Sequence, residues 1–344
     1  AELEQFRQTR IIMGLSQEKF SYELEAGEEI IGPEVIMTFS SEGLGRLSQN
    51  YHMCIRKNIC RGKFRDLTRP VVLNTWEALY FDFNGKKILE IAKQAQNLGI
   101  DMLVLDDGWF INRNDDRRAL GDWTADETKL GCTLGELVKN INGLGLKFGL
   151  WVEPEMISED SRLYREHPEW AMIIPNEKPT LGRNQLVLDL SRCDVREYIF
   201  NAVSKLLDQA NIEYLKWDYN RSINEVYSHK TNNSKAIYDY VLGLYEILER
   251  INSCYPNVLI EGCAGGGGSG KVHQPGGLFQ RRRIFEKLHR RGQRRHRLCF
   301  THKEVHSPYT GRCAVCGRRS AVGCRLGCCQ SAGFTAERHS SAGH

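Results

Sequence analysis

Several features common in other classes of protein are missing from this 344-residue sequence. It contains no run of about 18 apolar residues, so we expect no membrane-spanning segment and no membrane partner. No G-x-G-x-x-G or Walker sequence follows an apolar run, which argues against a nucleotide cofactor. Residues 1–263 hold only three histidines, His52, His167 and His229, which is few for a metal site. We therefore expect neither a metal ion nor another cofactor.

Aspartate is absent after Asp239, and the balance of charge changes sharply near residue 263. Residues 1–263 carry 31 Lys+Arg and 40 Asp+Glu, a net charge of −9, whereas residues 264–344 carry 16 and 3, a net charge of +13. Six of the 12 cysteines lie in each part. Those of the first part are scattered, as is typical of reduced thiols in a cytosolic protein, and no signal peptide is visible. We expect a cytoplasmic location.

From residue 69 onward, apolar runs alternate with helical spacing of apolar residues. Five runs have the length and composition of buried strands: 71–76, 102–109, 147–155, 212–217 and 258–263. A further run at 185–190 follows a long excursion after the third of these strands. This alternation predicts a parallel sheet covered by helices, either an open doubly wound sheet or a (β/α)8 barrel. Polar and aromatic residues at the end of every strand favour the barrel, because barrels carry functional groups on all of these ends.

The N-terminal residues follow a different pattern. Three short β-rich runs predict antiparallel sheet: 9–13, 20–24 and 34–39. They are too few to form a sandwich alone, so we interpret them as the end of a larger β domain, followed by a basic helical connector at 42–68. The predicted α/β organisation has three parts: the end of a β-sandwich domain and linker at 1–62, a partial (β/α)8 TIM barrel of five βα units at 63–268, and a basic tail rich in Cys, Arg and His at 269–344.

The strand at 212–217 runs into Lys216-Trp217-Asp218-Tyr219-Asn220-Arg221, which places four polar groups within six residues. The ammonium group of Lys216 would lower the pKa of Asp218 and keep its carboxyl group ionised, as a nucleophile at neutral pH requires. The alternative is a structural Lys–Asp ion pair at a strand end. Because packing does not require so many polar groups, we predict that Asp218 is a nucleophile.

Two adjacent carboxylates, Asp106 and Asp107, follow the strand that begins at residue 102. Such a pair suits a metal ion or the vicinal hydroxyls of a sugar, and the scarcity of histidine leaves the metal site short of ligands. Several indoles could cover the apolar side of a sugar ring: Trp76, Trp109, Trp123, Trp151 and Trp217. The alternative is a helix N-cap beside a packed tryptophan. Glu153-Pro154-Glu155 fits an acid/base pair or a loop fixed by proline equally well.

Residues 1–263 closely resemble the α-galactosidases of glycoside hydrolase family 36. The matching segments are 69–70, 74–78, 105–110, 121–123, 149–156, 182–190, 216–221 and 262–268. The resemblance implies an N-terminal β-supersandwich, a catalytic (β/α)8 barrel and a C-terminal β domain. It also implies cofactor-free hydrolysis of terminal α-galactosides such as melibiose and raffinose, with retention of configuration, by an enzyme that is often a homotetramer.

The resemblance also assigns roles to individual residues. It makes Asp218 the nucleophile that forms a galactosyl-enzyme by double displacement, with Asp106 and Asp107 on the 4- and 6-hydroxyls of galactose. The other residues that it places around the substrate are Trp76 near the aglycone, Trp123, Arg183, Lys216 and Asn220 along the sugar, and Cys263 and Gly266 at its border.

The second catalytic carboxyl group of this family has no match in the sequence. A retaining glycosidase uses two carboxyl groups about 5–5.5 Å apart. The acid of this family would fall near residue 285, but no Asp follows Asp239, and the residues around Glu286 match nothing in the family. We therefore expect negligible hydrolysis by this chain, and the alternative function is a galactose-binding protein without catalysis.

The basic segment 264–344 has three interpretations. Its abundance of Arg, Cys and His without Asp favours out-of-frame or disordered sequence. A zinc module would use Cys313-x-x-Cys316, but the cysteines that follow are irregularly spaced. The arginines of 290–297 fit a nucleic-acid tail, yet frame-shifted codons explain them as well, and we expect no nucleic-acid partner. Since five βα units do not close an eight-stranded barrel, the open sheet edge predicts low stability.

Overall fold

The computed structural model describes residues 2–3, 9–11, 13–15, 20–33, 35–58, 60, 63–231 and 233–264. One unit contains residues 1–13 and another begins at Gly14, and each is described by itself. In the first unit, β1 (Glu2–Leu3) pairs antiparallel with β2 (Thr9–Arg10), which lies in the predicted run at 9–13. The described residues of the runs at 20–24 and 34–39 form no strand, so these two predictions are wrong. An extended segment becomes a strand only beside a second backbone that completes its hydrogen bonds.

The second unit contains a sheet of five parallel strands whose spatial order follows the chain. The strands are β3 (Val72–Asn74), β4 (Met102–Leu105), β5 (Lys147–Val152), β8 (Tyr214–Trp217) and β9 (Leu259–Gly262). Each lies within a predicted strand. Sequential parallel strands joined by helices are the first part of a (β/α)8 barrel, which confirms the predicted partial TIM barrel.

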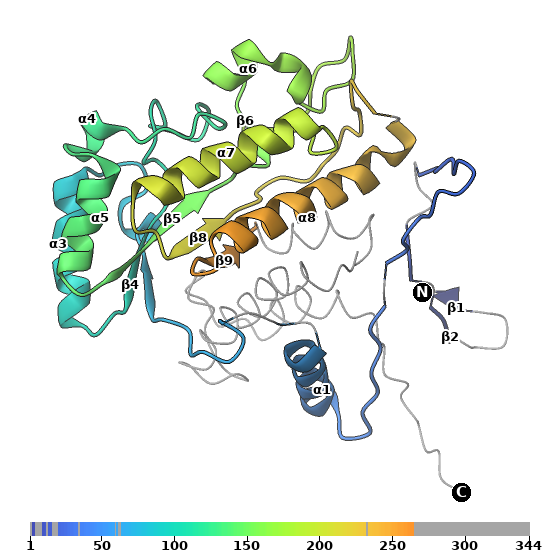
Figure 1. The fold of residues 1–344 in the computed structure, drawn as a ribbon, viewed down its shortest axis with the longest axis horizontal. Helices are drawn as coiled ribbons and strands as arrows, with labels where there is room; N and C mark the ends of the chain where they lie inside the picture. The colour runs from blue at the N-terminus through green and yellow to red at the C-terminus, as the bar shows by residue number, and fades with distance from the viewer. Residues whose placement is uncertain are drawn as a thin grey trace, which may run out of the picture. The chain divides into compact units, whose positions relative to one another are not determined.

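Four long helices connect these strands and cover the sheet: α3 (Gly85–Asn97), α5 (Leu134–Gly143), α7 (Cys193–Gln209) and α8 (Ala236–Cys254). Figure 1 shows α3 beside α5 and α7 beside α8. Apolar residues at helical spacing, such as Leu134, Leu137, Val138 and Ile141 of α5, are buried. The predicted capping box of α5 is present, with Thr133 Oγ1 accepting from Glu136 N at 3.2 Å.

The helix α1 (Leu44–Asn58) precedes β3. Shorter elements lie in the connections between strands: α2 (Trp76–Leu79), α4 (Glu127–Leu130), α6 (Arg162–Glu166) and the 3-10 turns η1 (Pro168–Trp170) and η2 (Asn233–Lys235). The predicted run at 185–190 forms β7 (Leu186–Val187), which pairs antiparallel with β6 (Met156–Ile157) outside the main sheet. No helix among the described residues is long and apolar enough to cross a bilayer.

Residues on both faces of β4 and β9 are buried, as is usual for parallel sheets, whereas the edge strand β3 is half-buried. In β4, Leu103 and Leu105 join the core beneath the helices, whereas Met102 and Val104 join a second cluster with Tyr214 of β8. The alternation follows from the two-residue period of a strand. Parallel pairing then places the C-terminal ends of all five strands on one edge, where the polar residues gather.

Close packing of α8 depends on Gly243, and this leads to a first prediction. A Cβ atom added there would lie 2.0 Å from the backbone oxygen of Leu190. We expect Gly243→Ala to lower the free energy of unfolding by about 1–3 kcal/mol, because helix and chain must separate to accept the methyl group. Gly143→Ala is the control, since a Cβ there meets nothing within 4 Å. Urea unfolding of both variants measures the effect, and an equal stability of the two would contradict the expectation.

Candidate active site

Three strand ends meet at the carboxylate of Asp106. Its Oδ2 atom accepts hydrogen bonds from Lys216 Nζ at the end of β8 and from Asn74 Nδ2 at the end of β3, each at 2.5 Å. Both Asp106 and the Lys216 side chain are largely shielded from solvent. Burial acts to lower the pKa of Lys216, but the surrounding negative charges, first of all that of Asp106, and the hydrogen bond to Asp106 together outweigh burial and raise the pKa. The ammonium group is therefore held in its charged form at this edge of the sheet.

Asp107 has a separate counter-ion. Arg113 Nε and Nη2 donate to its two carboxylate oxygens at 2.9 and 2.8 Å, and Arg113 Nη1 donates to the carbonyl oxygen of Arg118 at 2.7 Å. Burial raises the pKa of Asp107, although Arg113 acts in the opposite direction. The helix that follows, α4, is capped by Asp126 rather than by Asp106 or Asp107, so the N-cap alternative is wrong. Arg113 fixes the direction in which Asp107 presents its oxygens.

Asp218 follows β8 and is 5% exposed. Its Oδ2 atom accepts from Trp151 Nε1 at 3.0 Å and its Oδ1 atom from the Tyr219 backbone N–H at 2.9 Å. Burial acts to raise the pKa of Asp218, but the charge of Lys216 and these hydrogen bonds outweigh it and lower the pKa. The carboxylate is thus ionised and held in a fixed orientation, as nucleophilic attack requires.

The two glutamates after β5 point to different partners. Glu153 Oε1 accepts from the Asn220 backbone N–H at 2.6 Å, and its Oε2 from Gln185 Nε2 at 3.0 Å. Glu155 accepts instead from Trp217 Nε1 and from the hydroxyl of Tyr240 on α8, both at 2.7 Å. Both glutamates are enclosed within the protein. This arrangement favours the loop interpretation of Glu153-Pro154-Glu155 over an acid/base pair.

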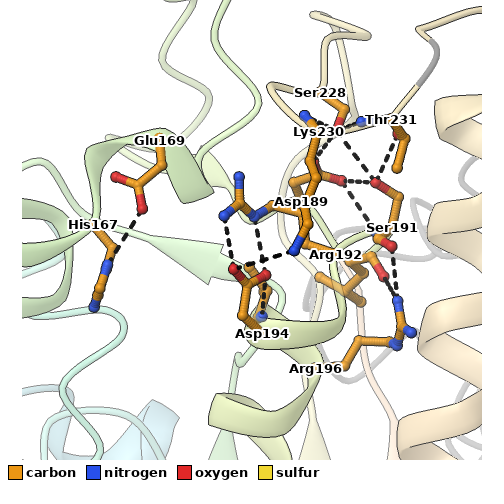
Figure 2. Close-up of polar contacts among 12 residues, drawn as sticks. His167, Glu169, Asp189, Ser191, Arg192, Asp194, Arg196, Ser228, Lys230 and Thr231 are labelled. Carbon is orange, nitrogen blue, oxygen red and sulfur yellow. Dashed lines mark hydrogen bonds and ion pairs between the residues drawn. The ribbon is translucent and has the colours of Figure 1, made fainter.

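The loop that follows Asp218 is anchored by a polar cluster around Asp189, which Figure 2 shows. The buried Asp189 carboxylate accepts from the hydroxyls of Ser191 and Ser228, each at 2.5 Å. Ser191 Oγ also lies 3.1 Å from Thr231 Oγ1. The cluster joins the end of the loop to the start of α7. A surface pocket of about 310 Å³ lies elsewhere and is lined by residues that include Ile173, Pro175 and His229. None of Asp106, Asp107, Glu153, Glu155 and Asp218 lines it.

The remaining predicted site residues occupy varied positions. Trp76 begins α2 and packs edge-on against Tyr80 and Phe81. Trp123 is buried among other aromatic rings, and its indole N–H has no hydrogen-bond partner in the described part of the chain. Cys263 is partly buried after β9, where its backbone N–H donates to the Trp217 carbonyl oxygen at 2.8 Å.

Arg183, Gly266 and Asn220 complete the set of predicted site residues. Arg183 is exposed and has a left-handed backbone (φ 54°) in the turn that ends at Gln185. Arg221 holds this turn, because its Nη1 atom donates to the carbonyl oxygens of Gln185 at 2.6 Å and Thr180 at 2.8 Å. Gly266 lies outside the described residues. Asn220 sits partly buried beside Asp218, and its side chain helps to lower the pKa of Asp218.

Sequence reasoning missed Arg113, Gln185 and the Asp189 cluster. Arg113 lies in a polar loop whose arginines look alike in the sequence, and only its burial distinguishes it. Within the described residues, no group of three or more His, Cys, Asp and Glu side chains converges as a metal site would require. The groups that do converge are two carboxylates and an ammonium, Asp106, Asp218 and Lys216, which can bind hydroxyls and supply a nucleophile.

Comparison with known proteins gives a consistent result. A model of the Melibiase family matches residues 30–282. The bifunctional α-galactosidase/sucrose kinase AgaSK of Mediterraneibacter gnavus is 54% identical over 268 residues, which cover 78% of this chain and 28% of that protein. The α-galactosidase AgaA of Geobacillus stearothermophilus is 48% identical over 281 residues, which cover 81% of this chain and 38% of AgaA.

Solved structures agree with these relatives. The galactosidase domain of AgaSK superposes with a TM-score of 0.74 at 52% identity and covers 79% of this chain and 38% of that one. A variant of the family 36 α-galactosidase AgaA from Geobacillus stearothermophilus, solved in complex with raffinose, gives a TM-score of 0.73 at 48% identity and covers 76% and 37%. The chain therefore spans well under half the length of these relatives.

Proposed function

This chain belongs to the Melibiase family, glycoside hydrolase family 36, and from that premise we propose that it carries the nucleophile half of an α-galactosidase active site. One observation carries the proposal: Asp218 is buried and ionised, with both oxygens held in place, beside a Lys216 that is bound to Asp106. Terminal α-galactosides of the raffinose type are the proposed substrates, since AgaA variants were solved with raffinose and with stachyose.

The proposed chemistry is a double displacement. An oxygen of Asp218 attacks the anomeric carbon, the bond from that carbon to the leaving-group oxygen breaks, and a galactosyl ester forms. Asp106 and Asp107 accept hydrogen bonds from galactose hydroxyls, while Lys216 pairs with Asp106 and its charge lowers the pKa of Asp218. Hydrolysis of the ester by water then gives galactose with its original configuration.

Protonation of the leaving group requires a second carboxyl group. Among the described residues, Glu153 and Glu155 also follow a strand at this edge, but both are enclosed by protein donors. The expected position of the acid, near residue 285, lies outside the described residues. We therefore propose that this chain forms the galactosyl ester from activated substrates and turns over ordinary galactosides negligibly. The tetramer and the cytoplasmic location stay predictions.

A covalent label tests the proposal. Fluoride leaves without protonation, so a fluorinated α-galactosyl fluoride should label Asp218 even without the acid. We expect one fluorogalactosyl adduct in the intact mass, mapped to Asp218 after proteolysis, and none in Asp218→Ala. Asp160→Ala, which alters an exposed aspartate, is the control and should label normally. Galactose binding by calorimetry without any adduct would instead favour the binding protein, and failure of both would refute an α-galactoside site.

A further inference from the structure

Glu153 is a buried acid to which the proposed chemistry gives no task. It is the first residue after β5 and is fully enclosed, with 0% of its surface exposed. Its two oxygens accept from two different segments: the Asn220 N–H of the loop after β8, at 2.6 Å, and the Gln185 side-chain amide of the turn before β7, at 3.0 Å. A single carboxyl group therefore joins three segments of the chain.

Two of these segments carry proposed substrate contacts. The loop after β8 holds Asp218 and Asn220, and the turn that ends at Gln185 holds Arg183. Arg221 strengthens the same junction, because it donates to the carbonyl oxygen of Gln185 and pairs with Glu225 at 3.3 Å. Removing Glu153 would therefore loosen the junction between the turn and the nucleophile loop, although Arg221 would still bond to the turn.

The surroundings of Glu153 do not favour a negative charge. Both of its hydrogen-bond donors are uncharged amides, and the ammonium of Lys216 is bound to Asp106. The titratable groups that act on Glu153 are Asp218 after β8, Asp107 after β4 and Tyr219 of the nucleophile loop. An isolated buried anion costs far more than a neutral acid, so a group in this position takes up a proton.

A hydrogen-bond acceptor for that proton is available. Gln185 Oε1 is buried and has no hydrogen-bond partner among the described residues. A rotation of the Gln185 side-chain amide by half a turn exchanges the positions of its oxygen and nitrogen atoms. A protonated Glu153 can then donate a hydrogen bond to Gln185 Oε1. Burial and then the charge of Asp218 raise the pKa of Glu153 to about 8, although the hydrogen bonds from Asn220 act to lower it.

We propose that Glu153 is a positioning residue whose uncharged carboxyl group joins the nucleophile loop to the Arg183 turn and leaves Asp218 as the reacting anion. The part that concerns Asp218 rests on the proposed function. Ionisation of Glu153 would place a second anion, without a counter-ion of its own, beside Asp218. Water could hydrate that charge only if the junction opened. Small displacements of a nucleophile lower its reactivity strongly.

The first test needs no substrate. The folded-state pKa of Glu153 lies above its ordinary value of 4.5, so its contribution to stability is full below about pH 4.5 and is lost as the pH rises to about 8. We expect the urea midpoint of the full chain to fall over this range relative to that of Glu153→Gln, which cannot ionise. Glu213→Gln, at the opposite edge of the sheet beside Lys147, should keep the wild-type dependence. A Glu153→Gln curve parallel to wild type would overturn the uncharged state.

The second test uses the galactosyl fluoride label between pH 6 and about 9. The labelling rate of wild type should fall above pH 8. The rate of Glu153→Gln should stay within about threefold of wild type at pH 7 and show no alkaline decline. The rate of Glu153→Ala should be about tenfold or more below wild type at every pH. An alkaline decline that persists in Glu153→Gln would overturn the positioning role. Absence of any label on wild type would refute the proposed function instead, and the urea series would then decide the charge state of Glu153 alone.

Discussion

Replacing Arg113 by methionine is expected to lower the free energy of unfolding at pH 7 by about 3–5 kcal/mol. The Arg113 side chain is 1% exposed and makes two hydrogen bonds to Asp107 and one to the Arg118 carbonyl oxygen. Methionine fills much of the same space but leaves a buried carboxylate without a counter-ion. The size of the effect comes from that uncompensated charge rather than from lost packing.

The pH dependence identifies this cause. Burial already raises the pKa of Asp107, and without Arg113 the pKa should rise further. The destabilisation should therefore shrink as the pH falls and Asp107 becomes protonated. Urea unfolding of wild type and Arg113→Met at several pH values measures this, with Arg118→Met as the control, because Arg118 is 45% exposed and pairs with surface aspartates. Equal penalties for the two arginines would contradict the argument.

Replacing Lys216 by methionine is expected to slow covalent labelling of Asp218 by roughly 10²-fold or more at pH 7. The ammonium of Lys216 bonds to Asp106 at 2.5 Å and its charge lowers the pKa of Asp218 against the effect of burial. Its loss leaves Asp106 and Asp218 without their shared cation, so the substrate meets a partly protonated nucleophile and an Asp106 that has lost its ammonium partner.

The labelling profile distinguishes this charge effect from misfolding. Because Lys216 lowers the pKa of Asp218, its removal should move the acid limb of the pH–rate profile to higher pH, and raising the pH should recover part of the rate. Lys147→Met is the matched control, since Lys147 pairs with Glu213 at the other end of the same sheet and its side chain is 55% exposed. A uniform loss of rate with no shift of the acid limb would point to misfolding.

Much of the fold could be predicted because its causes are local. Apolar residues at strand and helix spacing identified all five strands of the parallel sheet, and the Thr133–Glu136 pair identified the start of α5. The prediction of strands at 20–24 and 34–39 was wrong although it rested on the same kind of local pattern. A β-rich pattern states a preference, whereas pairing depends on which backbone lies alongside.

For the candidate site, the sequence predicted which residues lie at strand ends but not which of them contact one another. Lys216 and Asp106 were singled out by their positions, but 110 residues separate them, and their contact follows from the strand register. Glu153 and Glu155 are two residues apart and looked equivalent, yet one joins the nucleophile loop and the other α8. No local pattern distinguishes them, because both lie beyond the end of β5. The alternation of side chains between the two faces holds only within a strand.

Consecutive residues were enough to place carboxylates, amides or indoles at the ends of four apolar strands, since the hydrophobic period and the strand ends are local properties of the chain. The tertiary structure alone decided which cation serves which carboxylate. Arg113 bonds to Asp107, Lys216 to Asp106, and Glu153 is left with two amides. Charge states in a buried site depend on distance and on exclusion of water, and both arise only when segments far apart in the chain pack together.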